Sequence, residues 1–333
     1  MNLVITGAAG YIGSVAAEVL LRDGHAVTAL DNLSTGHRAA IPRGATLFEC
    51  ALDNRRRLGE LFSSQKIDAV IHLAAEALVE KSTREPELFY AVNVAGGVHL
   101  LEAMLRNKCK RIIFSSSAAV YGEPTVIPIP EDHPKAPVNP YGASKWRFEQ
   151  ILEDFRASVG LEYTVFRFFN VAGASEDHGE DHADETHLIP RVMQAARGQR
   201  EFININGDDH PTPDGTCIRD YVHVLDLAEA CRLALADFDR ANGETFNLGS
   251  DHGFSNREVV EAVRRVTRRD FRVVMYPKRA GDPARLVASA EKIRRVLGWK
   301  PSFPDLDGII ATAWSWMERF PNGYASRSAT GSH

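Results

Sequence analysis

The sequence predicts an α/β fold in which a parallel sheet is covered by helices on both faces and is followed by a smaller mixed α/β domain. Five short apolar runs alternate with longer amphipathic stretches through the first half of the chain: residues 2–6, 26–30, 67–74, 111–116 and 163–169. The runs are apolar on both faces, as strands buried between two layers of helices must be. Right-handed crossovers between such strands leave a ligand crevice at their carboxyl ends.

Helices are expected between these strands, most clearly at 12–22 and 93–106, where apolar residues recur at helical spacing. From residue 171 a long polar loop is followed by scattered short elements. We therefore expect two closely packed domains, 1–170 and 171–320, with some elements crossing between them. A disordered tail is expected over 321–333, where the sequence becomes small and polar. The short elements expected after the polar loop are 188–197, 224–235, 244–249, 256–268, 271–277 and 290–297.

The bulk composition is that of an ordinary globular protein: 333 residues, 44% hydrophobic and 25% charged, with a net charge of −5. This acidic balance argues against a nucleic-acid partner. The four cysteines are far apart and form no C-x-x-C motif, which favours reduced thiols. The chain enters an apolar strand at once, and no apolar run approaches the roughly 20 residues of a membrane span. We expect a cytoplasmic protein without a membrane partner.

A glycine-rich segment, "TGAAGYIGS", places Gly7, Gly10 and Gly13 directly after the first strand and at the start of a helix. The first glycine permits a tight turn, the second permits close approach of a pyrophosphate, and the third permits close helix–strand packing. Asp31 ends the second strand, where an acid accepts hydrogen bonds from a ribose and repels a 2′-phosphate. The first domain is therefore expected to be a Rossmann-like doubly wound parallel sheet that binds NAD.

A second motif, "NPYGASK", puts Tyr141 and Lys145 four residues apart, at the start of a helix for which Asn139 is a plausible N-cap. A free phenol has a pKa near ~10, too high for a base at neutral pH. A neighbouring ammonium and the helix N-terminus would both lower that pKa. The run "FSSSAAVYG" adds Ser117 as a hydroxyl relay where the crevice should open. This combination indicates a base that removes a proton from a hydroxyl while the nicotinamide takes hydride.

The polar loop 175–187 contains His178, His182 and His187 among aspartates and glutamates. This composition raises a metal site as an alternative, but the spacing matches no tight ligand motif. A solvated polar loop without a metal is the expectation.

Taken together, these motifs resemble the extended short-chain dehydrogenase/reductases, and more narrowly the UDP-galactose 4-epimerases. The resemblance runs from residue 2 to about 316. The segments that carry it are 31–36, 114–122, 139–145, 167–174, 207–228, which includes Arg219-Asp220-Tyr221, and 280–284.

The resemblance implies a NAD that is retained through the cycle. Tyr141 would deprotonate the sugar 4-hydroxyl with help from Ser117, Lys145 would hold the nicotinamide ribose, and the 4-keto sugar would turn over before reduction. It also implies a homodimer, formed by the helix at 93–106 and the helix after Tyr141. Domain 1–170 would bind NAD through Gly7, Gly10, Tyr11, Ile12, Gly13, Asp31, Asn32, Leu33, Ser34, Thr35, Gly36, Leu52, Leu73, Ala74, Ala75, Asn93, Ser117, Tyr141, Lys145 and Phe169. Domain 171–320 would bind the UDP-sugar, and the implied substrate residues are Ser117, Tyr141, Asn170, His187, Leu188, Asn204, Ile205, Asn206, Arg219, Arg279, Asp282 and Leu286.

Several positions depart from the family pattern. Glu76 and Ala77 stand where some relatives carry a lysine that reaches the NAD phosphate, and His187 replaces a frequent asparagine. Leu286 aligns with a gate residue that is bulky in relatives restricted to plain hexoses and smaller in those that accept N-acetylhexosamines. Leucine is intermediate, so the sugar stays open.

Three alternatives to a UDP-hexose 4-epimerase stay open. They are a 4-epimerase of another UDP-sugar (N-acetylhexosamine, pentose or uronate), a 4,6-dehydratase and a non-catalytic NAD-sensing regulator. Ala118 and Ala119 disfavour dehydration, because dehydratases carry an acidic pair after the serine. A regulator need not keep Ser117, Tyr141 and Lys145 together, so this triad favours the epimerase.

Overall fold

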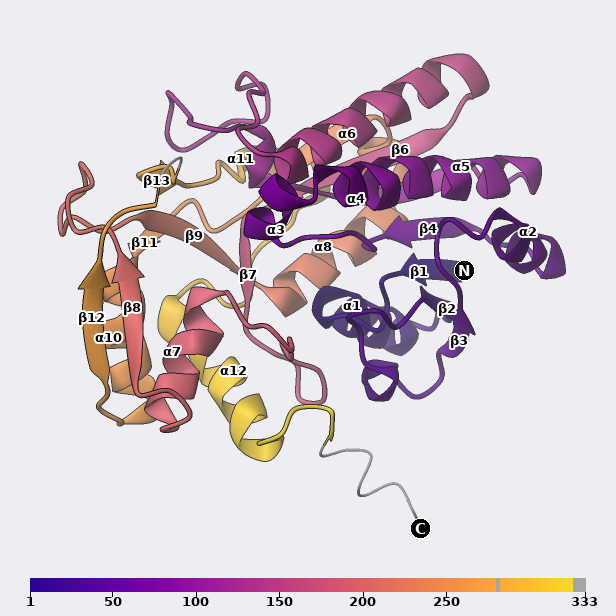
Figure 1. The fold of residues 1–333 in the computed structure, drawn as a ribbon. Coiled ribbons are helices and arrows are strands. Elements are labelled where there is room, and N and C mark those ends of the chain that lie inside the picture. Colours follow the sequence, from indigo (N-terminus) through magenta and orange to yellow (C-terminus); the bar gives the residue numbers. More distant parts are fainter. Residues whose placement is uncertain (280–281, 326–333) are drawn as a thin grey trace, which may run out of the picture.

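A seven-stranded parallel sheet organises the NAD-binding half of the expected fold (Figure 1). The computed structural model describes residues 1–279 and 282–325. The sheet has the order β10-β6-β5-β4-β1-β2-β3, and every neighbouring pair is parallel. The order reverses between β1 and β4, which confirms the doubly wound fold and opens a crevice at the strands' carboxyl ends. The strands are β1 (Asn2–Thr6), β2 (Ala26–Asp31), β3 (Thr46–Glu49), β4 (Ala69–His72), β5 (Arg111–Ser117), β6 (Glu162–Phe168) and β10 (Glu244–Leu248).

Helices cover both faces of this sheet, as predicted. Strand β1 shows why: Leu3 and Ile5 point into one apolar cluster and Val4 into another, because successive side chains of a strand alternate between faces. In Figure 1, α1 and α8 lie on one side of the sheet and α5 and α6 on the other. One layer contains α1 (Tyr11–Arg22), α8 (Val224–Ala236), α9 (Phe238–Ala241) and α11 (Glu291–Leu297), and the other contains α2 (Arg55–Ser64), α5 (Gly97–Arg106) and α6 (Pro140–Val159).

A helical stretch from Pro86 to Arg106 is 21 residues long and is apolar enough, by length and composition alone, to cross a membrane. It contains α4 (Pro86–Tyr90), a π-helical segment (Ala91–Gly96) and α5, and it follows α3 (Val79–Arg84). Leu100 and Met104 of this stretch are fully buried in the core between the sheet and α6. Burial inside the protein is the ordinary reason for such an apolar helix.

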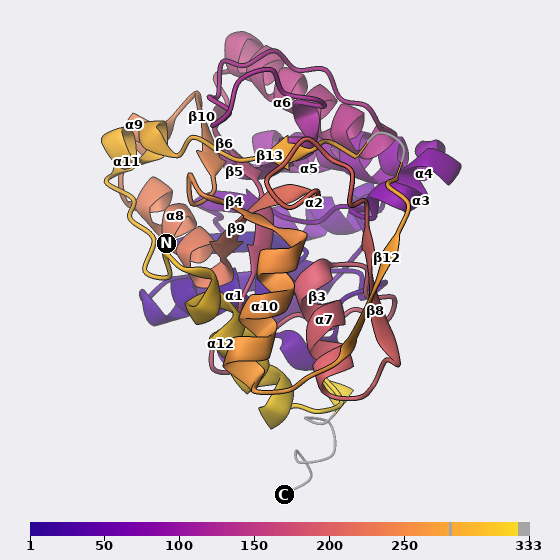
Figure 2. The ribbon, with the colours of Figure 1, turned by 90° about the vertical axis from the view of Figure 1, so that its left-hand side faces the viewer.

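A smaller mixed lobe packs beside the sheet. Strand β9 is its centre, pairing with β7 and β13 in parallel and with β11 antiparallel, while β8 and β12 form a separate parallel pair. Figure 2 shows α10 between α7 and α12 on the outer side of this lobe. Its elements are β7 (Asn170–Ala172), α7 (Leu188–Ala196), β8 (Phe202–Asn206), β9 (Ile218–His223), β11 (Gly253–Ser255), α10 (Asn256–Thr267), β12 (Arg272–Tyr276), β13 (Arg285–Leu286) and α12 (Leu306–Arg319).

The chain crosses between the two lobes, so the expected boundary at residue 170 does not separate them in sequence. Strand β10 closes the edge of the large sheet beside β6, and α8 packs on α1. Strand β3, strand β9 and the helices α2 and α12 were not identified from the sequence. All five strands predicted in the first half are present within a few residues of their expected bounds.

Two expectations about polar segments are wrong. The loop 175–187 is not a solvated loop: His178 is only 4% exposed, and its Nδ1 lies 2.7 Å from Glu18 Oε2 of α1. The disordered tail was expected to begin at residue 321, and this boundary is too early. Tyr324 is 2% exposed, and its hydroxyl donates to the Gly179 carbonyl. The loop 175–187 and the segment around Tyr324 pack against each other, although they are more than 100 residues apart in sequence. Residues 326–333 lie outside the described residues.

Candidate active site

The glycine loop has the shape that a dinucleotide pyrophosphate requires. Gly7 has φ +70°, and a Cβ there would lie 2.8 Å from the Ala74 nitrogen; a Cβ on Gly13 would lie 2.1 Å from the Gly7 oxygen. The fold itself therefore requires these two glycines. At Gly10 a Cβ would meet only the Gly7 oxygen, at 3.3 Å. Space is thus kept open beside the first backbone N–H groups of α1, at Tyr11 and Ile12, where an anion binds favourably.

Asp31 connects this loop to the rim that follows β2. Its Oδ2 accepts a hydrogen bond from the Ala9 nitrogen (2.9 Å) and its Oδ1 accepts one from the Leu33 nitrogen (2.8 Å). A Cβ on Gly36 would lie 2.8 Å from Ala9, so the rim, residues 32–36, lies directly on the glycine loop. The rim contains the predicted residues Asn32, Leu33, Ser34, Thr35 and Gly36, and the Asn32 side chain accepts from Ser34.

The segment after β4 forms the other wall of the cofactor crevice. The hydroxyl of Thr6 hydrogen-bonds with His72 Nδ1 at 2.8 Å and accepts from the nitrogens of Leu73 (3.2 Å) and Ala74 (3.1 Å). This buried contact holds residues 73–75 against Gly7. His72, the last residue of β4, is 1% exposed and lies in the core. Thr6 was not identified from the sequence, since a threonine at a strand end carries no distinctive signal.

Asn93 holds the next part of this wall in place. It is 2% exposed, its oxygen accepts from the Glu76 nitrogen (2.8 Å), and its amide donates to the Glu76 carbonyl (3.0 Å) and to Ser144 Oγ (3.0 Å). The carboxylate of Glu76 lies 3.2 Å from Lys81 Nζ. The sequence alone did not explain an acid at the expected cofactor crevice. The ion pair explains it, because the charge of Lys81 balances that of Glu76. Leu52 is also buried here, against Gly96.

The predicted triad converges where β5 ends and α6 begins. Asn139 caps α6 by accepting from the Gly142 nitrogen (2.8 Å), as its sequence position indicated. The helix then places Lys145 one turn beyond Tyr141, with its Nζ 6.0 Å from the centre of the Tyr141 ring and donating to the Ser115 carbonyl at 2.8 Å. Ser117, the last residue of β5, lies near enough to the Tyr141 side chain to influence its pKa.

The direction of the Tyr141 pKa differs from the expectation. Burial raises the pKa of Tyr141 above its ordinary value, and the nearby Ser117 side chain opposes that rise without cancelling it. Burial also lowers the pKa of Lys145 to about 7, with the Glu149 charge opposing. A partly neutral amine is a weaker electrostatic partner than a full ammonium. The expectation that Lys145 and the helix terminus alone would lower the phenol's pKa is therefore wrong for the polypeptide.

A buried polar network beneath the triad was missed by sequence reasoning. Glu149, one turn beyond Lys145 on α6, accepts from Arg167 Nε (3.0 Å) and Nη2 (2.6 Å) and from the Ser116 hydroxyl. Arg167 also donates to the Tyr121 hydroxyl at 2.8 Å. The i, i+4 spacing from Lys145 to Glu149 was the one available signal.

Predicted substrate residues of the small lobe form two groups. In the first, the Asn206 side-chain oxygen accepts from Arg279 Nε (2.8 Å) and Nη2 (3.1 Å) in one orientation of its amide, and from the Asn204 amide (3.1 Å) in the other. Arg279 also pairs with Glu80 of α3 at 2.9 Å, so this group bridges the lobes. Arg191 of α7 donates to Asn204 and was not identified from the sequence. Ile205 is buried between the two asparagines in β8.

The second group is the Arg219-Asp220-Tyr221 motif of β9. Arg219 pairs with Asp282, and Tyr221 lies opposite Asn170 where β9 pairs with β7. Asp220 is 1% exposed and accepts from the nitrogens of Ser250 (2.7 Å) and Ala288 (3.0 Å). These last bonds hold the segment that carries the gate residue against β9. Burial raises the pKa of Asp220 to about 7.

Leu286, which the resemblance assigns as a gate residue, lies in β13. It packs against an apolar cluster that contains Ala118 and Phe169, the residues that directly follow Ser117 and strand β6. Two predicted residues lie elsewhere. Leu188 begins α7, and His187 Nδ1 lies 2.7 Å from Glu180 in the loop before that helix.

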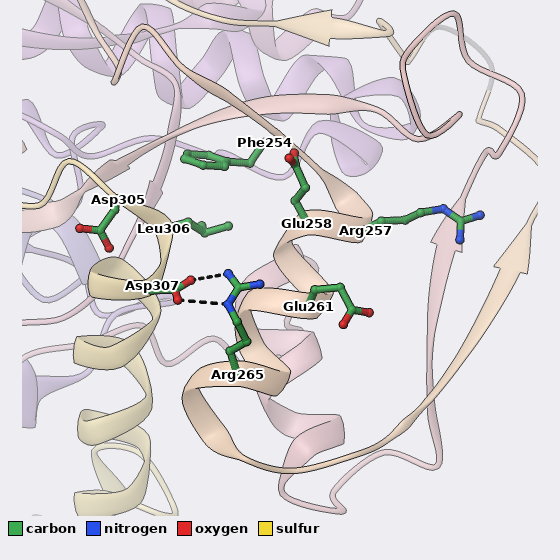
Figure 3. A pocket seen from close by; sticks show the side chains of 8 residues that line it. All are labelled: Phe254, Arg257, Glu258, Glu261, Arg265, Asp305, Leu306 and Asp307. Carbon is green, nitrogen blue, oxygen red and sulfur yellow. Dashed lines mark hydrogen bonds and ion pairs between the residues drawn. The ribbon is translucent and has the colours of Figure 1, made fainter.

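A groove of about 620 Å³ lies away from this site, on the outer side of the small lobe (Figure 3). Its walls come from β11, α10 and the start of α12, and Arg265 bridges across it to Asp307 at 2.7 Å. Its position separates it from the glycine loop and the triad.

Comparison with known proteins agrees with this geometry. The model of the NAD dependent epimerase/dehydratase family matches residues 3–249. A UDP-glucose 4-epimerase of Lacticaseibacillus casei is 47% identical over 331 residues, covering 98% of this chain and 100% of the relative. A crystal structure of a UDP-glucose 4-epimerase superposes with a TM-score of 0.95 at 46% identity, over 97% of this chain and 99% of that one. The Brucella ovis UDP-glucose 4-epimerase, solved in complex with NAD, gives a TM-score of 0.91 at 43% identity, over 94% and 97%. This chain therefore belongs to the NAD-dependent epimerase/dehydratase family and, within it, to the UDP-glucose 4-epimerases.

Proposed function

We propose that this protein interconverts UDP-galactose and UDP-glucose through a 4-keto sugar, with NAD retained during the cycle. The observation that carries the proposal is the convergence of Ser117, Tyr141 and Lys145 beside a glycine loop that leaves room for a pyrophosphate at Gly10. The printed names of the relatives support the same activity.

In this proposal Tyr141 removes the proton of the sugar 4-hydroxyl, and Ser117 orients that hydroxyl by hydrogen bonding. NAD, when bound, would accept the hydride of the sugar C4 and later return it to the opposite face of that carbon, and its positive charge would favour the phenolate. Lys145, held by the Ser115 carbonyl, presents its amine to the nicotinamide ribose and to the phenol. The 4-keto sugar then rotates so that its other face is reduced, and Tyr141 returns the proton to the 4-oxygen. Asp31 and the rim 32–36 hold the adenosine ribose.

The UDP part is proposed to bind between the two small-lobe groups. Arg219 and Arg279 are the forked cationic donors that suit a diphosphate. In the structure Arg219 pairs with Asp282, and Arg279 pairs with Glu80. A bound diphosphate would either replace these carboxylates as the partner of the arginines or bind to the arginines alongside them. Asn170, Leu188, Asn204, Ile205 and Asn206 would complete the nucleotide and sugar contacts, together with His187.

The preferred sugar is set by Leu286 in this proposal. Its contact with the apolar cluster that contains Ala118 and Phe169 supports this role. We also propose a cytoplasmic homodimer, assembled through the helix at 93–106 and α6, without a nucleic-acid or membrane partner.

The test is proton NMR of the purified protein with UDP-galactose and no added NAD, following the anomeric signals. Appearance of UDP-glucose would support both 4-epimerisation and a retained cofactor. A repeat with UDP-N-acetylgalactosamine tests the sugar preference. No conversion of UDP-galactose, even after NAD is supplied, would refute the proposal and favour another UDP-sugar or a regulatory role.

A further inference from the structure

Four side chains in the loop before α7 point their donor atoms at one another. His187 Nδ1 lies 2.7 Å from Glu180 Oε1 and 3.0 Å from Glu185 Oε1, and His182 Nδ1 lies 3.3 Å from both carboxylates. One donor atom of each of the four residues lies within 4.8 Å of every other. The sequence spacing did not indicate this arrangement, because it arises from the fold of the loop.

The two carboxylates of this group, the Glu180–Glu185 cluster, are largely withdrawn from solvent. Their side chains are 10% and 4% exposed. With neutral imidazoles the cluster would carry two buried negative charges, which is costly unless a cation balances them. Two imidazolium ions or one divalent cation would provide that balance.

The spacing of the donor atoms is close to that of a metal site. Each histidine Nδ1 contacts an oxygen of both carboxylates, so the four side chains converge on one point rather than forming two separate pairs. Ligand atoms of a tetrahedral zinc site are separated by about 3.3 Å, given bonds of roughly 2.0–2.2 Å. The two His182 distances of 3.3 Å already meet this value, and the His187 distances of 3.0 Å and 2.7 Å need to lengthen by about 0.3 Å and 0.6 Å.

We propose that Glu180, His182, Glu185 and His187 bind one divalent transition-metal ion of the Zn²⁺ class. Two imidazole nitrogens and two carboxylates form a mixed N/O donor set that suits such ions, whereas Mg²⁺ and Ca²⁺ prefer oxygen ligands alone. The imidazoles bind as neutral ligands, so loading releases any protons they carry.

The place of the cluster in the fold suggests a structural role. Glu185 Oε1 also accepts from the His187 nitrogen at 2.7 Å, which fixes the turn into α7. The same loop contacts the start of α1, where the Tyr11 hydroxyl donates to the Gly173 carbonyl at 2.5 Å. A bound ion would therefore tie the loop 173–187 to α7 beside the residue that opens the cofactor-binding helix.

The test uses the full-length protein, stripped with chelator and dialysed against buffered Zn²⁺, with bound metal measured directly and thermal unfolding followed in parallel. We expect one equivalent of Zn²⁺ and a higher unfolding temperature. His182→Gln should weaken binding by more than the roughly 10- to 100-fold expected for loss of a supporting partner. His252→Gln is the matched control, because His252 is exposed and lies outside the cluster.

Co²⁺ provides a second readout, since intense visible absorption bands report four-coordinate binding. If His182→Gln fails to fold, Glu185→Gln takes its place, and this variant should lack the Co²⁺ bands. Zn²⁺ uptake by the wild type that is no greater than by His182→Gln would overturn the proposal and favour a histidinium–carboxylate cluster. Bands equally strong in the wild type and in the foldable variant would also overturn it. The assay contains no UDP-sugar, so its failure leaves the proposed epimerase activity untouched.

Discussion

Replacement of Lys145 by methionine should make the cofactor-free protein more stable while abolishing turnover. Lys145 is 3% exposed, and burial lowers the pKa of its amine from 10.5 to about 7. A buried ammonium is retained at a cost to stability when its function requires it. Methionine has a similar length, no charge and a flexible chain that can fill the same space.

The magnitude follows from the pKa. The gap between 10.5 and about 7 corresponds to about 4.8 kcal/mol. Loss of the hydrogen bond to the Ser115 carbonyl offsets about 1–2 kcal/mol of the gain. At pH 7 we therefore expect Lys145→Met to raise the free energy of unfolding by about 3 kcal/mol.

The same reasoning requires a particular pH dependence. Below about pH 7 the amine is protonated in both folded and unfolded states, so the full cost is present. Between about pH 7 and 10.5 the unfolded chain binds more protons than the folded one, and the wild type gains stability as pH rises. Methionine cannot titrate, so the advantage of the variant should shrink towards zero, or below it, by pH 10.5.

Urea unfolding of wild type, Lys145→Met and the exposed control Lys300→Met at pH 7 and pH 10 measures these differences. Groups that titrate in both proteins cancel in the comparison. A variant that is less stable than the wild type at pH 7, or a stability difference that does not change with pH, would refute the account of Lys145 as a buried, destabilising amine.

Four further substitutions test the site. Tyr141→Phe should lower turnover by roughly 10²- to 10⁴-fold while NAD content, measured after denaturation, stays the same; an active variant would contradict the base assignment. Gly13→Ala should destabilise the fold by about 3 kcal/mol or more, because its Cβ would lie 2.1 Å from the Gly7 oxygen. Gly10→Ala should cost under about 1 kcal/mol yet release NAD, and equal urea midpoints for the two glycine variants would disprove this contrast. Leu286→Tyr should selectively reduce any turnover of UDP-N-acetylgalactosamine, and NMR rates that fall equally with UDP-galactose would argue against the gate.

Several features of the site were predictable from the sequence because they depend on neighbours along the chain. A strand followed by Gly7, Gly10 and Gly13 specifies the loop, and helical periodicity places Tyr141 and Lys145 on one face. The Asn139 cap fixes where that helix starts. These signals extend over a few residues, so they survive without knowledge of the fold.

Other features were decided only when distant segments met. Strand β10 closes the sheet from the second half of the chain, Tyr324 covers the loop 175–187, and Arg167 neutralises Glu149 beneath Lys145. The direction of the Tyr141 pKa also belongs here, because burial outweighs the local contributions that its sequence neighbours indicate. Desolvation and the convergence of donor atoms depend on what the whole chain packs around a residue, and sequence spacing carries no record of that.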